Sequence, residues 1–112
     1  AQTCGIRLER DGAVAAYTAD TGPGSDFHAL AHDADVVICE ATFQDSDQPW
    51  WEGHMSAAQA GRMSSEVGAA RLVLTHLPPE RDHLVSLAEA EREAGSVLVE
   101  LARPSVPIEV GR

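Results

Sequence analysis

The chain has 112 residues, of which 44% are hydrophobic and 23% charged, and its formal net charge is -10 at pH 7. This length suits one domain with its own hydrophobic core, and no apolar run is long enough for a membrane-spanning helix, so no membrane partner is expected. The acidic charge argues against a broad basic surface for nucleic acid, but not against a nucleotide substrate at a metal site, where the ion sets the local field.

The first half of the sequence predicts a β-hairpin, a short helix and a buried strand. Residues 4–9 and 13–18 flank an Asp-Gly turn, which is typical of a β-hairpin. Asp26 is a favourable N-cap residue, so we expect a short helix that runs to about Asp33. The compact apolar run 36–39 is expected to form a buried strand.

The second half alternates helix and strand. Residues 44–53 are polar apart from two tryptophans, and we expect them to form an exposed loop. The elements expected after this loop are a helix with the capping box Ser56-x-x-Gln59 that ends at Gly68, a strand at 71–75, a helix from Asp82 to Gly95, and strands at 97–101 and 107–110. Helix followed by strand three times predicts an α/β fold.

Three of the predicted strands are followed by an ionisable residue: Asp20, Glu40 and His76. His54 precedes a helix in a loop that can reach the same edge of the sheet. Open α/β sheets hold their ligands at the carboxyl ends of the strands. Carboxylate oxygen and imidazole nitrogen are ligands for divalent zinc, and a carboxylate beside a histidine can prepare it to protonate a leaving group. The pattern therefore predicts a metal or acid–base site.

Each of these residues also has a structural explanation. Asp20 could begin a turn, Glu40 could be a solvated strand end, and His54 could be an exposed residue beside its helix. His76 could simply end a strand before two prolines, which cannot continue it. Both interpretations stay open at the level of composition and position.

The remaining histidines, cysteines and tryptophans have simpler explanations. His28, His32 and His83 are expected to lie on helix surfaces. Cys4 and Cys39 are expected to be buried, reduced thiols of a cytoplasmic protein, because they stand far apart in strand-like surroundings. The pair Trp50-Trp51 is expected to pack within its loop, to contact a partner or to form a lid.

Four short motifs occur in order between residues 17 and 79. They are Tyr17-Thr18-Ala19-Asp20-Thr21-Gly22-Pro23, Cys39-Glu40-Ala41-Thr42-Phe43, Gly53-His54-Met55-Ser56-Ala57-Ala58-Gln59-Ala60-Gly61 and Leu72-Val73-Leu74-Thr75-His76-Leu77-Pro78-Pro79. Together they resemble the C-terminal half of metallo-β-lactamase-fold hydrolases, in the ribonuclease Z and cyclic-nucleotide phosphodiesterase branch. The chain departs from the usual ribonuclease Z wording at Cys39, where histidine is common, and at Met55, which interrupts the Gly-His-Ser loop.

The resemblance implies half of an αββα sandwich, with a mixed sheet that carries helices on one face, and a role for each candidate residue. By this resemblance Asp20 bridges two metal ions and His76 is the last histidine ligand of the second ion. His54 contacts the scissile phosphate and assists the leaving group, and Glu40 pairs with His54. The implied cofactors are two divalent metal ions, zinc with manganese as the alternative. The implied reaction is attack by a metal-bound hydroxide on a phosphodiester, in RNA or in a cyclic nucleotide.

The family's His-x-His-x-Asp-His motif does not occur among the 112 residues. Because that motif lies in the N-terminal half of the fold, we expect residues 1–112 to be the C-terminal half, inactive alone and dependent on an N-terminal half as partner. Two metal ligands are too few for a dinuclear site. A homodimer is also expected. The alternatives are a metallohydrolase of another ester or amide, and a non-catalytic half-fold that serves as an oligomerisation or interaction module.

Overall fold

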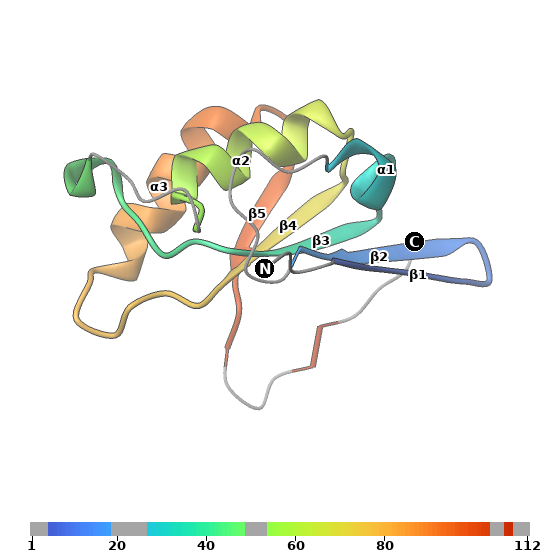
Figure 1. The fold of residues 1–112 in the computed structure, drawn as a ribbon, viewed down its shortest axis with the longest axis horizontal. Helices are drawn as coiled ribbons and strands as arrows, with labels where there is room; N and C mark the ends of the chain where they lie inside the picture. The colour runs from blue at the N-terminus through green and yellow to red at the C-terminus, as the bar shows by residue number, and fades with distance from the viewer. Residues whose placement is uncertain (1–4, 19–26, 49–53, 104–106, 109–112) are drawn as a thin grey trace.

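The computed structural model describes residues 5–18, 27–48, 54–103 and 107–108, to which all structural statements below refer. Five strands form one sheet in the order β1-β2-β3-β4-β5 (Figure 1). The strands are β1 (Ile6–Arg10), β2 (Ala13–Tyr17), β3 (Val36–Glu40), β4 (Arg71–Thr75) and β5 (Leu98–Leu101). The helices are α1 (His28–Ala31), the 3-10 helix η1 (Asp45–Asp47), α2 (Ala57–Glu66) and α3 (His83–Ala94). The predicted α/β fold with a mixed sheet is confirmed.

The direction of the strands follows from the length of their connections. β1 and β2 are antiparallel because a tight turn joins them, and Asp11 and Gly12 occupy its positive-φ positions. β2, β3, β4 and β5 are mutually parallel, since a helix crosses over between each pair. Glu40 and Thr75 are paired at the carboxyl ends of β3 and β4. The two strands therefore end level with each other, which brings Glu40 and the residue before His76 to the same edge of the sheet.

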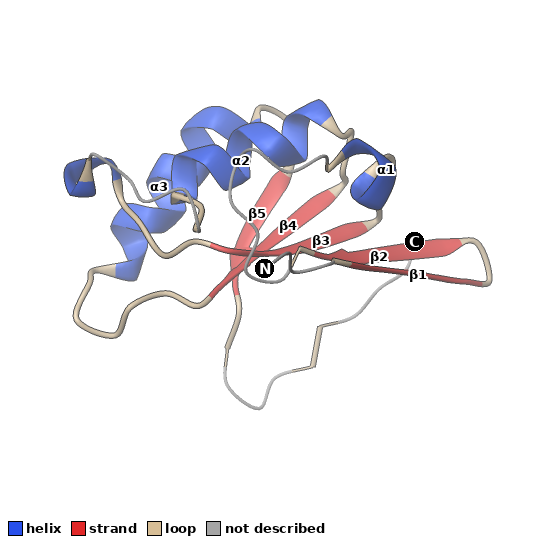
Figure 2. Ribbon diagram, in the orientation of Figure 1, coloured by secondary structure: helices blue, strands red, loops and turns tan. Residues whose placement is uncertain are grey.

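The hydrophobic core lies between the sheet and the three α-helices, which cover one face of it (Figure 2). Residues directly opposite each other in neighbouring strands point to the same face. One such row crosses β2 to β5, and all its members are buried in the core: Ala16, Val37, Leu72 and Val99. Small residues on the helices, including Ala60 of α2 and Ala90 of α3, complete this core and allow the helices to approach the sheet and each other closely.

Local sequence signals set where α2 and α3 begin. Ser56 caps α2: its hydroxyl accepts from the Gln59 amide at 3.0 Å, and the Gln59 side chain accepts from the Ser56 amide at 2.8 Å. The predicted capping box is therefore confirmed. Asp82 caps α3 by accepting from the Leu84 amide at 3.0 Å, and Gly95 follows the helix with φ +63°.

α2 and α3 approach each other closely at Gly61. A Cβ atom at position 61 would lie 2.2 Å from the carbonyl oxygen of Ala90, which is backbone and cannot rotate away. Helix propensity alone would make Gly61→Ala stabilising by about 1 kcal/mol. Because the clash forces the helices apart, we expect the variant instead to lower the free energy of unfolding by about 2–3 kcal/mol.

Urea unfolding followed by circular dichroism measures this difference. The matched control is Ser65→Ala, an exposed position on the same helix, where only the propensity gain of a few tenths of a kcal/mol is expected. A Gly61→Ala variant more stable than the parent would contradict the close approach of the two helices.

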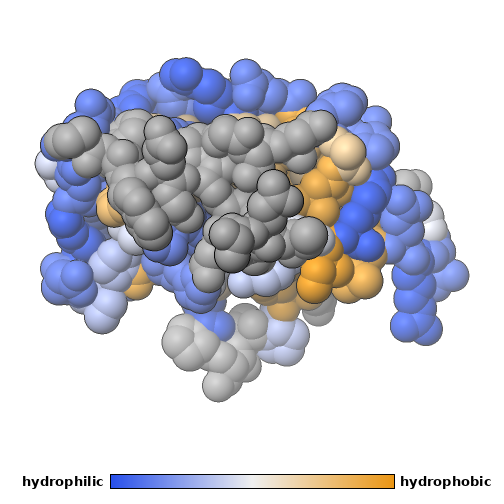
Figure 3. Space-filling view, viewed as in Figure 1, coloured by the Kyte–Doolittle hydropathy of each residue, from blue (hydrophilic) through white to orange (hydrophobic). Residues whose placement is uncertain are grey.

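The opposite face of the sheet carries no helix within the described residues (Figure 1). Ile6, Leu8 and Leu98 stand in the rows that alternate with the core rows, and they are 52%, 64% and 58% exposed. Figure 3 shows hydrophobic residues reaching the surface beside and below α1. We call this side of the sheet the helix-free face. The exposed apolar side chains lie on the outer strands β1 and β5, whereas Val36 and Val73, between them in the same rows, are buried.

Some expected elements differ from the observed ones. Pro107 and Ile108 are not in a strand, so the strand predicted at 107–110 is wrong for its described residues. The region 44–53 is not simply an exposed loop, because Gln44 is buried and η1 follows it. The polar sequence gave no periodic signal for this helical turn, because Asp45 is held by side chains of α3 and the turn buries no apolar face. No helix of the described part is long and apolar enough to cross a membrane.

Candidate active site

Glu40 is the last residue of β3, and its side chain is buried. Three donors surround the carboxylate. Oε2 accepts from the Thr42 amide at 3.0 Å and from the Thr42 hydroxyl at 2.5 Å, and Oε1 accepts from the Met55 amide at 2.5 Å. Burying a carboxylate without such partners would cost several kcal/mol. The alternative that Glu40 is a solvated strand end is therefore wrong.

His54 lies beside this carboxylate. Its Nδ1 atom is buried and stands 3.6 Å from Glu40 Oε1, while 30% of the histidine side chain is exposed. The other ring nitrogen, Nε2, is on the side of the imidazole away from Glu40. A carboxylate facing Nδ1 fixes the tautomer and orientation of a histidine, which leaves Nε2 to exchange a proton with a ligand. The structure brings Glu40 and His54 side by side at a separation longer than a hydrogen bond, and their functional pairing stays a prediction.

Contacts from the residues that follow His54 and Glu40 hold the two residues together. Met55, which follows His54, is buried, and its amide binds Glu40 directly. The ring of Phe43 meets the His54 imidazole edge to face, with centroids 6.1 Å apart and an interplanar angle of 77°. Thr42 was not among the candidate residues from the sequence. The sequence signal that could have identified Thr42 is its position two residues after the strand-end glutamate. At that spacing both its amide and its hydroxyl can donate hydrogen bonds to the carboxylate.

His76 follows β4 at the same edge of the sheet. Its neighbour Thr75 is paired with Glu40, and the Thr75 carbonyl accepts from the Ala41 amide at 2.9 Å. His76 has φ +53°, in the left-handed region that residues other than glycine adopt uncommonly. Its side chain is exposed. Strained conformations of this kind persist where surrounding structure imposes them, and they gather at functional sites.

The structure brings together part of the predicted site. Glu40 and His54 are adjacent, and His76 lies one residue beyond the strand pair that carries Glu40. Asp20 and the pair Trp50-Trp51 lie outside the described residues. Among the residues that are described, no group of three or more His, Cys, Asp or Glu side chains could hold a metal ion. His76 has the donor chemistry of a metal ligand, so it fits a metal site only as one member of a larger set of ligands.

Cys39 precedes Glu40 and is inert as a nucleophile. Burial raises the pKa of the Cys39 thiol to about 12, the hydrogen bond with Thr18 opposes this rise, and the nearby charge of Glu40 adds to it. Because the thiolate is the reactive form, the folded protein keeps Cys39 unreactive at neutral pH. In the unfolded chain the same thiol ionises near its ordinary pKa of 9.0. Stability is therefore lost as pH rises from about 9 towards 12.

The other histidines were expected on helix surfaces, which holds for His28, whereas His32 follows the end of α1 and both His32 and His83 are half-buried. His28 is exposed and His32 half-buried, and their rings stack 5.5 Å apart. The His83 ring contacts the Pro78 carbonyl at 2.9 Å, which closes the loop after His76.

Comparison with known proteins assigns this chain to a family. Residues 1–77 match the model of the beta-lactamase superfamily domain. An uncharacterised protein of Mycobacterium tuberculosis is 36% identical over 93 residues, which cover 80% of this chain and 34% of that protein. Ribonuclease Z of Salinibacter ruber is 42% identical over 90 residues, which cover 79% of this chain and 27% of that enzyme.

A solved structure shows the same fold. The crystal structure of the metallo-β-lactamase fold protein YhfI from Bacillus subtilis superposes with a TM-score of 0.77 and 31% identity, over 96% of this chain and 44% of that chain. The chain thus spans about a third of the length of its curated relatives.

Proposed function

Because the chain belongs to the beta-lactamase superfamily domain family and has the metallo-β-lactamase fold, we propose that it forms the C-terminal half of a metal-dependent phosphodiesterase. The observation that carries this proposal is the buried Glu40 carboxylate held against His54 beside the carboxyl end of β4. The names of the relatives support the reaction class, since they include ribonuclease Z and a probable metallo-hydrolase. The substrate proposed is a phosphodiester, in RNA or in a cyclic nucleotide.

In this proposal each residue of the pair has one task. Glu40, fixed by the amides of Thr42 and Met55 and by the Thr42 hydroxyl, holds the imidazole of His54 in one tautomer. Nδ1–H then faces the carboxylate, so His54 acts as an acid only as the imidazolium, which gives its Nε2 proton to the oxygen that leaves phosphorus and returns to the neutral Nδ1–H form. The separation of 3.6 Å between Nδ1 and Oε1 exceeds hydrogen-bond length, and such contacts often tighten only when substrate binds.

The metal requirement follows from the family rather than from a complete site in this chain. Asp20 and His76 are the proposed ligands, and two ligands do not complete a divalent site. When bound, divalent ions supply activation of a water molecule and neutralisation of developing charge on phosphate. Zinc is the proposed metal, with manganese as the alternative.

The helix-free face gives the proposed place for the remaining part of the fold. Its exposed apolar residues Ile6, Leu8 and Leu98 would be buried against a second sheet layer, and this layer would bring further metal ligands. We use "the completed protein" for this chain together with that upstream half, on one polypeptide or on two. A homodimer of the completed protein is part of the proposal.

The test compares the chain alone with the completed protein, each loaded with zinc or manganese, on a panel of phosphodiesters, carboxylic esters and amides. We expect hydrolysis of phosphodiesters by the completed protein only, with a loss of activity when a chelator removes the metal. Cyclic nucleotides and a short RNA with a 3′ extension separate the two substrate classes. Preference for a carboxylic ester or an amide would refute the phosphodiesterase, and a folded, metal-loaded protein without any hydrolysis would favour an interaction module.

A further inference from the structure

Residues 42–48, here called the connector segment, lie between the site and α3. Phe43 is joined to the His54 loop on both sides of Ser56, because the Phe43 amide donates to the Met55 carbonyl at 3.3 Å and the Ala57 amide donates to the Phe43 carbonyl at 2.9 Å. Its ring also contacts the His54 imidazole. Any shift of Phe43 is therefore transmitted to the loop that carries His54 and the Met55 amide.

The next residue, Gln44, anchors the connector segment to α3. Gln44 is 6% exposed, and its side-chain amide donates to the Asp82 carbonyl at 2.9 Å and to the Ser86 hydroxyl at 3.2 Å. Ser86 is 1% exposed. These contacts join positions far apart in the sequence, at the N-terminal turn of α3. Asp82 also belongs to the loop that follows His76. Gln44 therefore links the connector segment, which contacts the His54 loop, to the loop that follows His76.

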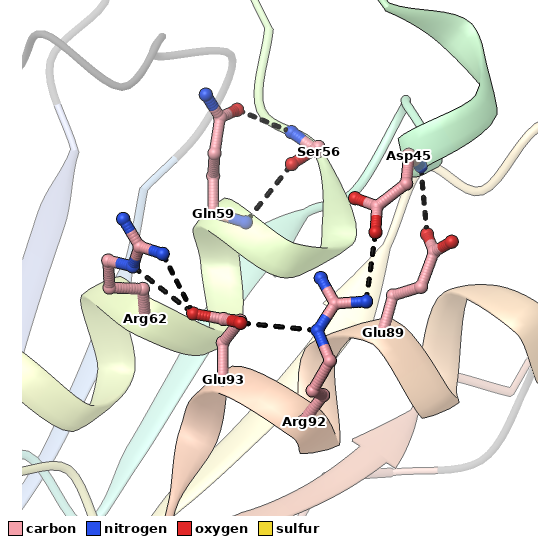
Figure 4. A network of polar contacts seen from close by, with 7 residues as sticks. All are labelled: Asp45, Ser56, Gln59, Arg62, Glu89, Arg92 and Glu93. Atoms are coloured by element: carbon pink, nitrogen blue, oxygen red, sulfur yellow. Dashed lines mark hydrogen bonds and ion pairs between the residues drawn. The ribbon is translucent and has the colours of Figure 1, made fainter.

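Ionic contacts strengthen the same attachment at the surface. The Asp45 amide donates to Glu89 at 3.0 Å, and its carboxylate pairs with Arg92 at 2.9 Å (Figure 4). Asp47 pairs with Arg81. Figure 4 also shows Arg92 meeting Glu93, which in turn binds Arg62 of α2. The ion pairs of Arg92 and Arg62 have a largely exposed partner and contribute little individually, while the side chain of Asp47 is only 14% exposed and adds to the attachment. Removing the hydrogen bonds of the buried Gln44 amide costs more than losing an exposed ion pair, so Gln44 is a main anchor of the connector segment.

We propose that Gln44 is a positioning residue for the Glu40–His54 pair. This inference rests on the proposed function for its catalytic consequence, but its structural step stands apart from any activity. Gln44 fixes the connector segment on α3. The backbone hydrogen bonds of Phe43 then hold residues 54–57 in place relative to this segment, and this keeps the Met55 amide and His54 beside Glu40. The residue has no contact with the reacting atoms in this scheme.

The structural step is tested on this chain by amide hydrogen exchange. Gln44→Met keeps the length of the side chain and removes its donors, and the Asp82 carbonyl retains its bond from the Val85 amide at 3.1 Å. We expect exchange of the Met55 amide to rise about tenfold relative to that of Leu72 in the core. The matched control is Ser64→Ala, which also removes a buried side-chain hydrogen bond, to Gly61 at 2.8 Å, away from the connector segment.

Unchanged exchange at Met55 in Gln44→Met, or an equal rise in Ser64→Ala, overturns the structural step. Ser86→Ala provides a second variant if Gln44→Met does not fold, because it removes only one of the two acceptors. It should raise exchange at Met55 by a smaller factor.

The catalytic step is tested in the completed protein. Gln44→Met is expected to lower kcat about tenfold or more with KM changed less than about twofold, since a small misplacement of a catalytic group acts on the reaction step. In the background of His54→Ala it should lower kcat no further, because the group it positions is gone. An additive loss, or an equal effect of Ser64→Ala on kcat, overturns the positioning role. If His54→Ala alone leaves kcat unchanged, the proposed function fails, while the exchange result at Met55 stands.

Discussion

Replacement of His54 by alanine is expected to lower kcat of the completed protein on an alkyl phosphodiester by about 10²–10⁴-fold, because general acid catalysis contributes this much. The metal content should be unchanged, since His54 is not one of the proposed ligands and its Nδ1 faces Glu40. A loss of stability of about 1 kcal/mol is expected, because most of the side chain is buried and its ring packs against Phe43. Steady-state kinetics and metal analysis by mass spectrometry measure both quantities.

The choice of leaving group separates proton donation from other roles of His54. A nitrophenolate leaves without a proton, so His54→Ala should retain most of its rate on bis(4-nitrophenyl) phosphate. His28→Ala is the control, because His28 is an exposed histidine of α1. Equal losses on both substrates would show that His54 does not act as an acid.

Replacement of His76 by alanine is expected to remove one of the two divalent ions and to abolish phosphodiester hydrolysis in the completed protein. Loss of one ligand from a site of three or four typically weakens metal binding by orders of magnitude, and a dinuclear centre then loses its second ion. Competition with a chromophoric chelator measures the stoichiometry. Two tightly bound ions per protein in His76→Ala would show that the ligand assignment is wrong.

A second variant at the same position tests the left-handed backbone of His76. His76→Asn retains a residue that tolerates φ near +53°, so it should fold as the parent does and still bind less metal. His32→Ala serves as the control for removal of a histidine outside the site. Metal loss in His76→Asn without loss of stability would separate ligation from strand termination.

The parts of the fold that could be predicted from the sequence are those set by local chemistry. The apolar runs that became β3 and β4, the capping box at Ser56 and the glycine after α3 each act over a few residues. Glu40 and His76 each follow an apolar run, which placed both near the carboxyl ends of strands. The register that sets Glu40 opposite Thr75 came from the structure.

What could not be predicted depended on contacts between distant residues. The burial of Glu40 relies on the Met55 amide, 15 positions away, and the burial of Gln44 on Ser86, 42 positions away. Sequence patterns report periodicity within an element and carry little information about such partners. For the same reason Gln44 was assigned to an exposed loop, because its polarity indicates solvent unless a buried acceptor is known. The role of Asp20 stays a prediction.

The helix-free face also has a consequence for the behaviour of the chain in solution. Its apolar side chains favour self-association, and the net charge of -10 opposes it by mutual repulsion between molecules. This repulsion is screened within about 8 Å at physiological ionic strength, whereas the hydrophobic attraction is strengthened by salts such as sulfate. The solubility of the isolated chain should therefore depend on salt. Added salt weakens the repulsion between the negatively charged molecules and should promote their association through the helix-free face.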